Sequence, residues 1–294
     1  MYRVAIIGLG NIGRFAMDAV NDAPDMELAG VVRRRAGEKE VRGVPIVQNI
    51  EELGKVDAAL LCTPSRSVED TAYAYLSKGI VTVDSFDIHS KINELRGNLD
   101  KAAKAGNCAA VVSAGWDPGS NSVIRALLEA CAPKGITYTN FGPGMSMGHT
   151  VVVKSKKGIA GALSMTIPTG TGVHRRMVYV QLEPSANLED VAADIKADPY
   201  FSSDETHVIA VKDVSQLIDM GHGVNMVRKG VSGAAHNQIF EFNMKINNPA
   251  VTSQIMVSCA RAAMRQKPGA YTMIEIPVID FLPGKREYWI DKLV

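Results

Sequence analysis

The most constraining feature of this chain is the glycine pattern GLGNIG at residues 8–13. It follows an apolar, β-branched run at 2–9, which predicts a buried strand, and leads into an amphipathic helical pattern at 13–23. Between a strand and a helix, the first glycine permits a tight turn, the second lets backbone approach a pyrophosphate, and the third allows close packing. The start of the helix offers free N–H groups to phosphates. We therefore predict a dinucleotide-binding turn formed by Gly8, Gly10, Asn11, Ile12 and Gly13.

The alternation of strand and helix patterns continues to about residue 117. Further strands are predicted at 26–33, 56–64, 80–86 and 108–115, and helices at 49–56, 67–79 and 91–107. Strands that alternate with helices imply βαβ units and a parallel sheet with right-handed crossovers. The predicted fold class is α/β: a Rossmann-type doubly wound parallel sheet, joined to a second α+β domain for substrate binding and dimerisation.

Three arginines follow the second predicted strand, where many nucleotide-binding chains carry a carboxylate. A carboxylate there accepts hydrogen bonds from the ribose 2′-OH of NAD and would repel a phosphate. Guanidinium groups instead bind a 2′-phosphate and stack on adenine. We therefore expect NADP, bound by Arg33 and Arg34, with Arg35 as a further candidate. The alternative is a solvated basic turn, whose field Glu38 and Glu40 would weaken.

Two later loops follow predicted strands, at the sheet edge where an open α/β fold binds its ligand. The first is expected beside the cofactor and supplies Cys62, Thr63, Pro64 and Ser65. In the second, Ser85 is expected to contact the cofactor. Asp84 directly follows the apolar strand and is the stronger active-site candidate, whereas Asp87 could simply cap the next helix.

The pattern changes after Trp116. A turn and helix are predicted at 114–133, then a glycine-rich loop at 138–150. Strand-like runs at 161–168, 175–184, 205–214 and 236–246 predict an antiparallel or mixed sheet, with a helix at 249–266 on one face. The predicted division is a dinucleotide-binding domain at 1–117, a substrate-binding and dimerisation domain at 118–266, and a segment at 267–294 that returns to the first domain.

Composition argues against several classes of function. Lys plus Arg is 32 against 31 for Asp plus Glu, which argues against nucleic-acid or acidic-membrane binding. No apolar run approaches the roughly 18 residues of a membrane helix, and the first residues do not resemble a signal peptide. The four cysteines are scattered, without metal-ligand spacing, so we expect reduced thiols and no metal. The expected location is the cytoplasm.

Several motifs in order resemble the meso-diaminopimelate dehydrogenase family over nearly the whole chain: SAGWDPG, FGPGMSMGHT, TIPTG, HRRMVYV, NNPAVTSQI and GAYTMIEI. The resemblance implies NADP-dependent, reversible oxidative deamination of the D-configured carbon of meso-2,6-diaminopimelate. The products would be L-2-amino-6-oxopimelate, which cyclises to tetrahydrodipicolinate, with ammonia and NADPH. The small-molecule partners would thus be meso-diaminopimelate and ammonia. We also expect at least a homodimer, because a sheet with one open face needs cover.

The resemblance also implies residue roles. Asp84 and Asp117 would be catalytic and lie beside the reacting amine, with Trp116 and Phe141 as an apolar wall. Met147 and Gly148 would offer backbone contacts, and the distal amino acid group would be held by Thr166, Arg176, His222 and Asn248. Phe141 and Met147 replace Trp and Gln of some members. This is closer to the branch that also aminates other 2-oxo acids to D-amino acids.

The residue chemistry agrees with these roles but leaves alternatives open. Arg176 and His222 could hold carboxylates, and aspartates suit ammonium groups. However, one of Arg175 and Arg176 is expected to face solvent, and His222 and Asn248 could serve only as turn residues. Rival functions are a dihydrodipicolinate reductase-like enzyme, another small Rossmann reductase, or a non-catalytic NADP-binding sensor.

Overall fold

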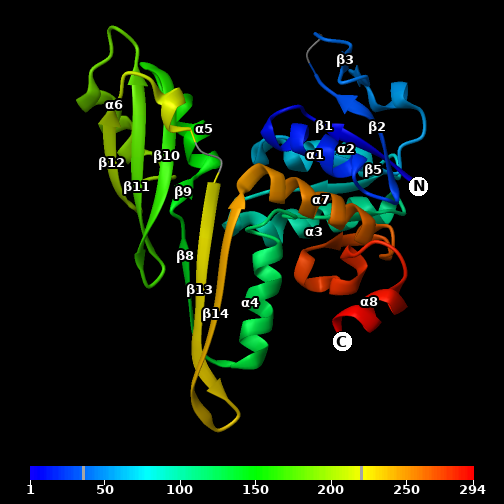
Figure 1. Ribbon diagram of the computed structural model, residues 1–294. Helices are drawn as coiled ribbons and strands as arrows, with labels where there is room; N and C mark the ends of the chain where they lie inside the picture. Colours follow the sequence, from blue (N-terminus) through cyan, green and yellow to red (C-terminus); the bar gives the residue numbers. More distant parts are fainter. Residues whose placement is uncertain (35–36, 219–220) are drawn as a thin grey trace. The chain divides into compact units, whose positions relative to one another are not determined.

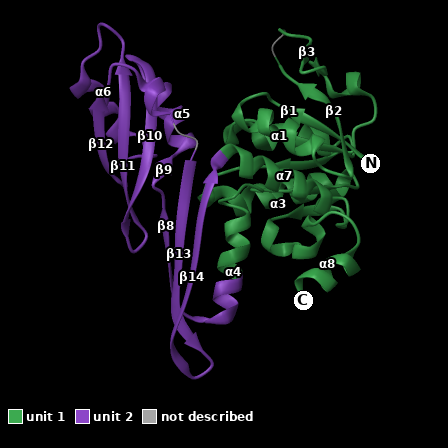
Figure 2. Ribbon diagram, in the orientation of Figure 1, with its two compact units in different colours: residues 1–126, 249–294 green, residues 127–248 purple. Residues whose placement is uncertain are grey.

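The computed structural model describes residues 1–34, 37–218 and 221–294, which form two compact units (Figure 2). Unit 1 comprises residues 1–126 and 249–294, and unit 2 comprises residues 127–248. The first boundary falls inside helix α4 (Ser120–Cys131), and the second falls at the start of helix α7 (Asn248–Ala263).

An eight-stranded sheet lies at the centre of unit 1, in the order β15-β7-β6-β5-β1-β2-β4-β3 (Figure 1). Its strands are β1 (Tyr2–Ile7), β2 (Met26–Val32), β3 (Glu40–Val41), β4 (Val44–Val47), β5 (Ala58–Leu61), β6 (Val81–Asp84), β7 (Ala109–Val111) and β15 (Gly269–Tyr271). Neighbours are parallel, except that β3 is antiparallel to β4. Because β2 and β5 flank β1 on opposite sides, the winding direction reverses at β1, and ligands bind such sheets outside this point. The predicted Rossmann-type sheet is confirmed.

The core of unit 1 explains why its strands could be predicted from the sequence. β5, β6 and β7 are buried along their whole length, and strands covered on both faces read as continuous apolar runs. One hydrophobic core joins these strands to α7 and to α1 (Asn11–Asn21), α2 (Val68–Leu76) and α3 (Ile92–Ala105). The predicted helix at 49–56 is instead a short 3₁₀ turn at Ile50–Leu53.

Helix α7 lies in unit 1, not in the predicted domain at 118–266. Its Met256, Val257 and Cys259 are fully buried in the unit 1 core. The Ser253 hydroxyl donates to the Ile12 carbonyl oxygen at the start of α1 (2.7 Å). The observed boundaries at 126/127 and 248/249 therefore differ from the predicted 117/118 and 266/267, because packing rather than sequence neighbourhood assigns the helix.

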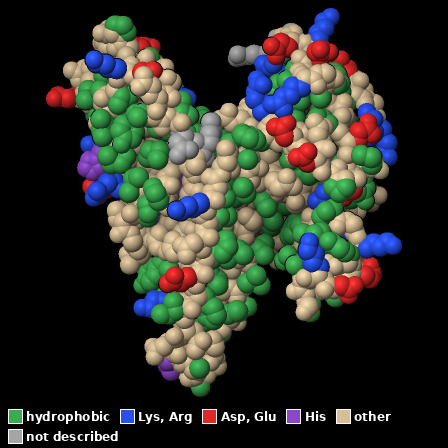
Figure 3. Space-filling view, viewed as in Figure 1, with side chains coloured by type: hydrophobic (Ala, Val, Ile, Leu, Met, Phe, Trp, Pro, Cys, Tyr) green, Lys and Arg blue, Asp and Glu red, His purple; other side chains and the backbone are tan. Residues whose placement is uncertain are grey.

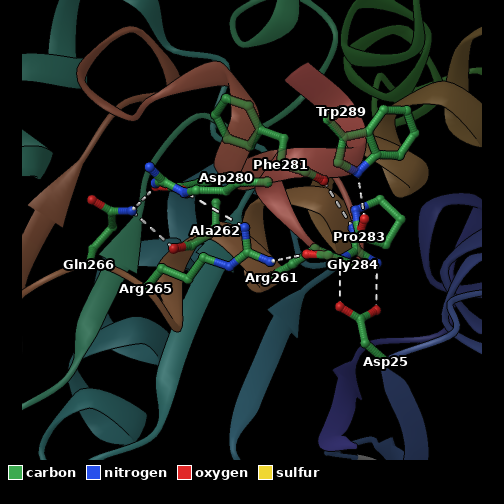
Figure 4. A network of polar contacts seen from close by, with 11 residues as sticks. Asp25, Arg261, Ala262, Arg265, Gln266, Asp280, Phe281, Pro283, Gly284 and Trp289 are labelled. Carbon is green, nitrogen blue, oxygen red and sulfur yellow. Dashed lines mark hydrogen bonds and ion pairs between the residues drawn. The ribbon is translucent and has the colours of Figure 1, made fainter. Parts of the chain in front are cut away.

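The chain after β15 also lies in unit 1, where the Arg261 guanidinium of α7 donates through Nη1 to the Phe281 carbonyl oxygen (3.0 Å) (Figure 4). Arg261 donates to both carboxylate oxygens of Asp25 (2.6 and 2.7 Å), which tie α7 to the chain just before β2. The buried Asp280 accepts hydrogen bonds from Arg286 (2.5 Å) and Gln266 (3.1 Å). Helix α8 (Arg286–Leu293) ends the chain. These contacts fix the C-terminal segment to the nucleotide-binding fold.

Unit 2 contains two smaller sheets. One has the order β12-β11-β10-β9, with β10 antiparallel to β9 and β11, and β11 parallel to β12. The other is antiparallel, in the order β14-β13-β8. Their strands are β8 (Lys134–Phe141), β9 (Gly144–Met145), β10 (Ile159–Gly170), β11 (Val173–Leu182), β12 (Glu205–Ala210), β13 (Gly221–Ser232) and β14 (Ala235–Asn247). Helix α5 (Met147–Lys154) packs on β10, and α6 (Leu188–Ala197) precedes β12 (Figure 1).

Unit 2 corrects two predictions. The segment 138–150, predicted as a loop, contains the end of β8, all of β9 and the start of α5. His222, for which a role as a turn residue was left open, lies on strand β13. Glycines interrupt both segments, and a two-residue strand such as β9 has no periodicity of its own. The pairing that makes these strands comes from partners distant in sequence, which a local pattern does not contain.

No helix among the described residues is long and apolar enough to cross a membrane. All four cysteines are free thiols in this structure. The described residues also contain no group of three or more His, Cys, Asp or Glu side chains arranged to hold a metal ion.

Candidate active site

The turn between β1 and α1 makes the close approaches that its glycines permit. Gly8 has a φ of +98°, and a Cβ on it would lie 2.6 Å from the Cys62 carbonyl oxygen. A Cβ on Gly13 would overlap the Gly8 carbonyl oxygen. By contrast, no described atom lies within 4 Å of the position that a Cβ on Gly10 would take. The outer glycines thus permit local packing, and Gly10 leaves open space beside the backbone for a ligand.

The first turn of α1 faces the same region. Gly10 is the N-cap residue, and none of the described side chains caps it. The Arg14 N–H donates to the Gly10 carbonyl oxygen (3.0 Å), so the preceding N–H groups of Asn11, Ile12 and Gly13 have no partner within the helix. Together with the helix dipole, these groups form an anion site of the kind that binds a pyrophosphate.

A cavity of about 540 Å³ lies beside this turn and the end of β2. Five predicted cofactor residues line it: Gly8, Arg33, Arg34, Thr63 and Pro64. The Arg33 N–H donates to the Val47 carbonyl oxygen (2.9 Å), which fixes the backbone at the end of β2. Figure 3 shows basic side chains gathered at this end of unit 1. Arg35 lies outside the described residues.

Other residues that line this cavity were not predicted. They include Gln48, Asn49, Glu51, Tyr75 and Lys78, which come from the chain after β4 and from the end of α2. Lys78 forms an ion pair with Glu51. Burial raises the pKa of Tyr75, Glu51 adds to this rise and Arg34 opposes it, so the Arg34 charge lies near the ring. Because these residues come together through the sheet, no single motif could have indicated them.

The loop after β5 is only partly turned toward the large cavity. Burial raises the pKa of the Cys62 thiol to about 12, so the thiol stays neutral. The Thr63 hydroxyl is buried, and no described group is its hydrogen-bond partner, which leaves it available to a ligand. Ser65 lies elsewhere: its hydroxyl donates to Asp87 (2.6 Å), and it lines a second cavity of about 220 Å³. Asp87 therefore holds this loop.

Asp84 is fully buried at the end of β6. Its Oδ1 accepts hydrogen bonds from the backbone N–H groups of Phe86 (3.0 Å) and Ser113 (2.9 Å), whereas Oδ2 has no partner among the described residues. Burial raises the pKa of Asp84 to about 6, against the lowering effect of the two N–H groups. A buried carboxyl with one free oxygen and a pKa near neutrality can take up and release a proton. The adjacent Ser85 lies near Gly115, whose Cβ would be 3.7 Å from that of Ser85.

Trp116 and Asp117 follow β7, the neighbour of β6 in the sheet, and both side chains are buried. The Asp117 carboxylate accepts two hydrogen bonds from Arg125 (3.2 and 2.5 Å) and one from Asn121 (3.2 Å). Arg125 lies on α4 and was not among the predicted residues. This bidentate pair fixes the carboxylate and offsets its charge.

In unit 2 a row of residues crosses the four-stranded sheet: Gly144 on β9, Thr166 on β10, Arg176 on β11 and Thr206 on β12. Arg176 Nη1 donates to the Thr166 hydroxyl oxygen, and Arg176 Nε donates to Asp204 Oδ2 (2.6 Å). Thr166 is buried and Arg176 is half-buried, whereas the adjacent Arg175 has 43% of its side chain exposed. The prediction that one of these arginines faces solvent is confirmed.

His222 adjoins this row from the three-stranded sheet. It is buried, and a Cβ on Gly144 would lie 2.5 Å from its Cα, so the two backbones touch. Its Nδ1 is 2.9 Å from the Gly223 carbonyl oxygen, to which it can donate. Three predicted substrate residues from separate strands, Thr166, Arg176 and His222, therefore lie in succession within unit 2.

The other predicted residues of unit 2 lie at element ends. Phe141 ends β8, where its N–H donates to His174 Nε2 (2.8 Å) and its ring lies 5.5 Å from the His174 ring. Burial, with help from Arg176, lowers the pKa of His174, which therefore acts as a neutral acceptor. Met147 and Gly148 begin α5, so their N–H groups point out of the helix end. Asn248 is half-buried at the start of α7.

Residues 2–113 match the NAD-binding Rossmann fold of an oxidoreductase family, and residues 115–173 match the diaminopimelic acid dehydrogenase C-terminal domain. The meso-diaminopimelate D-dehydrogenase of Bacteroides fragilis is 60% identical over 295 residues and covers 99% of both chains. That of Lysinibacillus sphaericus is 34% identical over 305 residues and covers 94% of both.

Solved structures extend the likeness to the fold. A C. glutamicum DAP dehydrogenase in complex with DAP matches with a TM-score of 0.92 at 29% identity, covering 100% of this chain and 99% of the other. An engineered D-amino acid dehydrogenase bound to NADP+ matches with a TM-score of 0.88 at 28% identity and the same coverage. A dihydrodipicolinate reductase from Paenisporosarcina, at 0.54 and 16% identity over 94% of this chain and 98% of its own, shares the fold alone.

Proposed function

Because this chain belongs to the meso-diaminopimelate D-dehydrogenase family, we propose that it deaminates the D-configured carbon of meso-2,6-diaminopimelate, reversibly and with NADP. The products are L-2-amino-6-oxopimelate, ammonia and NADPH. The observation that carries the proposal is the 60% identity with a curated relative over 99% of both chains. A match of that extent includes both the nucleotide-binding unit and the unit that carries Thr166, Arg176 and His222.

The residues of unit 1 fit NADP. The open space at Gly10 and the free first turn of α1 suit the pyrophosphate, and the buried, unpartnered Thr63 hydroxyl suits a cofactor hydroxyl or phosphate oxygen. Arg33 and Arg34 line the adjacent cavity, where two guanidinium groups favour a 2′-phosphate over a bare ribose hydroxyl. When bound, NADP supplies the hydride acceptor for the reaction.

The residues of unit 2 fit a distal amino acid group. A carboxylate is bound by the Arg176 guanidinium and by the N–H groups of Met147 and Gly148 at the start of α5. Thr166 and His222 lie in succession with Arg176 and add hydrogen bonds to the same distal amino acid group. Phe141 forms an apolar wall, and Asn248 completes the polar lining.

Proton transfer is assigned to Asp84. The amine must lose its ammonium proton before the C–H bond breaks, because its lone pair then forms the C=N bond. Asp84 Oδ2 accepts this proton, directly or through a water, since the pKa of this carboxyl is raised to about 6 by burial. Asp117, which is fixed by Arg125, accepts a hydrogen bond from the same amine. The buried Trp116 shields Asp117 and the amine from solvent. Water then adds to the imine carbon and ammonia leaves.

We further propose a cytoplasmic homodimer or larger homo-oligomer with some breadth of substrate. Exposed apolar side chains on the three-stranded sheet support assembly: Ile136 and Ile239 are 51% and 57% exposed. Phe141 and Met147, where some members have Trp and Gln, support reductive amination of other 2-oxo acids to D-amino acids. No specific contact favours the reductase or the sensor, since the reductase likeness concerns the fold alone.

The proposed function is tested by the absorbance of NADPH formed from meso-diaminopimelate by the purified protein. The LL isomer serves as the stereochemical control, and NAD replaces NADP in a parallel assay. We expect NADPH and ammonia in equal amounts from the meso isomer, little product from the LL isomer, and weak activity with NAD. Absence of turnover on any amine, with NADP still bound, would contradict the proposal and favour the sensor.

A further inference from the structure

One carboxylate beside the candidate substrate residues has no role in the proposed reaction. Asp204, in the turn before β12, accepts the Arg176 Nε hydrogen bond at 2.6 Å, and the two side chains are 21% and 14% exposed. A third group, the Thr166 hydroxyl oxygen, accepts a hydrogen bond from Arg176 Nη1. Within the described part of the chain no further acceptor binds this guanidinium, which leaves Nη2 for a ligand. Arg176 is thus both held in place and electrically balanced.

Among the described residues, the only salt bridge of Asp204 is that with Arg176. The Arg176 and Asp204 charges also act on His149 and His174, whose pKa values are both lowered, first by burial and then by Arg176. Both imidazoles are therefore neutral and leave the charge balance unchanged. The neighbouring Arg175 pairs with Glu205 on the exposed side of the strand (3.0 Å). The local charge at the distal subsite is consequently that of one arginine and one aspartate, which sums to zero.

We propose that Asp204 is a specificity-determining residue, because by balancing Arg176 it allows the distal subsite to accept substrates that lack a second carboxylate. This inference rests on the proposed function, in which Arg176 binds the distal carboxylate of meso-diaminopimelate. A partly buried guanidinium without a counter-charge would penalise any substrate that left it unpaired. With Asp204 present, the guanidinium remains paired whatever the substrate carries. Arg176 then discriminates by hydrogen bonds through Nη2 more than by net charge.

The test compares two substrates that differ only in the group at issue. D-Lysine is meso-diaminopimelate without its distal carboxylate and keeps the D-configured reacting centre. The ratio of kcat/KM for meso-diaminopimelate to that for D-lysine is measured for the wild type and for Asp204→Asn. Asparagine retains an oxygen that accepts the Arg176 Nε hydrogen bond, so the substitution removes charge and preserves orientation. Glu205→Gln, one residue away at the exposed Arg175 pair, is the matched control.

We expect the ratio to rise about ten-fold in Asp204→Asn, equivalent to about 1.4 kcal/mol, and to be unchanged in Glu205→Gln. The rise should diminish at high ionic strength, because screening weakens the unbalanced arginine charge. A purely structural role for Asp204 would change both substrates alike and would not produce this salt dependence. If Asp204→Asn folds poorly by its melting temperature, Asp204→Ser is measured in its place.

Two outcomes would overturn the inference, and they are distinguishable. If the wild type is active and the ratio is unchanged or lower in the variant, Asp204 only orients Arg176 and does not set specificity. If the wild type turns over neither substrate, the proposed function itself fails, and the inference fails with it.

Discussion

The two units hold their candidate site residues by different physical means. In unit 1 the site is made mainly of backbone: a glycine turn, the open end of α1 and loops at strand ends, all supported by one continuous core. In unit 2 it is made of side chains paired across strands, such as Arg176 with Thr166 and Asp204. The cores there are small and separate. We infer that binding of the cofactor pyrophosphate depends on open space beside the backbone, and that binding of the substrate depends on side-chain charge and strand register.

The largest expected effect tests whether unit 2 selects substrate without affecting the cofactor. Arg176→Leu removes the guanidinium proposed to bind the distal carboxylate. We expect kcat/KM for meso-diaminopimelate to fall about 1000-fold, since losing a partly buried, hydrogen-bonded charge partner costs about 4 kcal/mol. The dissociation constant of NADPH, measured by its fluorescence, should not change. Arg175→Leu, at the exposed neighbouring position, is the control, and an equal loss there would contradict the assignment.

The next effect tests whether unit 1 recognises the cofactor without affecting the substrate. Replacing Arg33 and Arg34 together by alanine removes both guanidinium groups from the cavity beside β2. We expect kcat/KM for NADP to fall about 100-fold while that for NAD changes little, because each charge-assisted bond to a phosphate contributes about 1.5 kcal/mol. The KM for meso-diaminopimelate at saturating cofactor should be retained. Parallel losses with NADP and NAD would show that the arginines do not recognise the 2′-phosphate.

A smaller effect concerns Asp84, a buried side chain within the largely backbone-built site of unit 1. The folded-state pKa is raised to about 6 from an ordinary value of 3.8, so between these pH values the folded state keeps a proton that the unfolded state releases. The free energy of unfolding therefore falls as pH rises through this window. Above the window, it has reached its full decrease from Asp84 and falls no further on this account. Asp84→Asn cannot ionise and should be more stable near neutral pH by about 2–3 kcal/mol, with little difference near pH 4.

Denaturant unfolding of the wild type and Asp84→Asn across this pH range measures the difference. In the wild type, kcat/KM should decline as pH falls below about 6, where Asp84 becomes protonated. A constant stability difference across the window would contradict the assigned pKa shift.

The smallest effect distinguishes two roles within the glycine turn: Gly13 permits close packing, and Gly10 leaves space for the cofactor. Gly13→Ala should lower the free energy of unfolding by about 1–2 kcal/mol, because its Cβ would overlap the Gly8 carbonyl oxygen even though alanine favours helix. Gly10→Ala should leave stability within about 0.5 kcal/mol, since the described structure leaves its Cβ in open space. The second variant should nevertheless weaken NADPH binding. Similar unfolding curves for both variants would contradict this distinction.

The sequence predicted unit 1 better than unit 2 for a physical reason. Buried parallel strands and a glycine turn are encoded within a few consecutive residues, and Asp84 was identified because it stands at the end of the apolar run of such a strand. Arg33 and Arg34 were likewise placed by their position after β2, and both line the cavity. Ser65 was less well predicted, because its contact with Asp87 depends on a neighbouring strand's loop.

In unit 2 the grouping of residues depends on register between distant segments. Thr166, Arg176 and His222 were named through family resemblance, and only the pairing of β9, β10 and β11, with His222 against Gly144, explains why they lie in succession. Asp204 was missed because the parallel pairing of β11 with β12 is not written in any local pattern. Arg125, which holds Asp117, was missed because an ion pair between a turn and the following helix leaves no periodic signal.

The central claim is that the chain transfers hydride from the D-configured carbon of meso-diaminopimelate to NADP. The most direct test uses two preparations of this substrate, one with deuterium on the D-configured carbon and one with deuterium on the L-configured carbon. The NADPH formed is analysed by mass spectrometry. Our account predicts deuterated NADPH from the first preparation and unlabelled NADPH from the second. Deuterium transfer from the L-configured carbon, or unlabelled NADPH from both preparations, would contradict it.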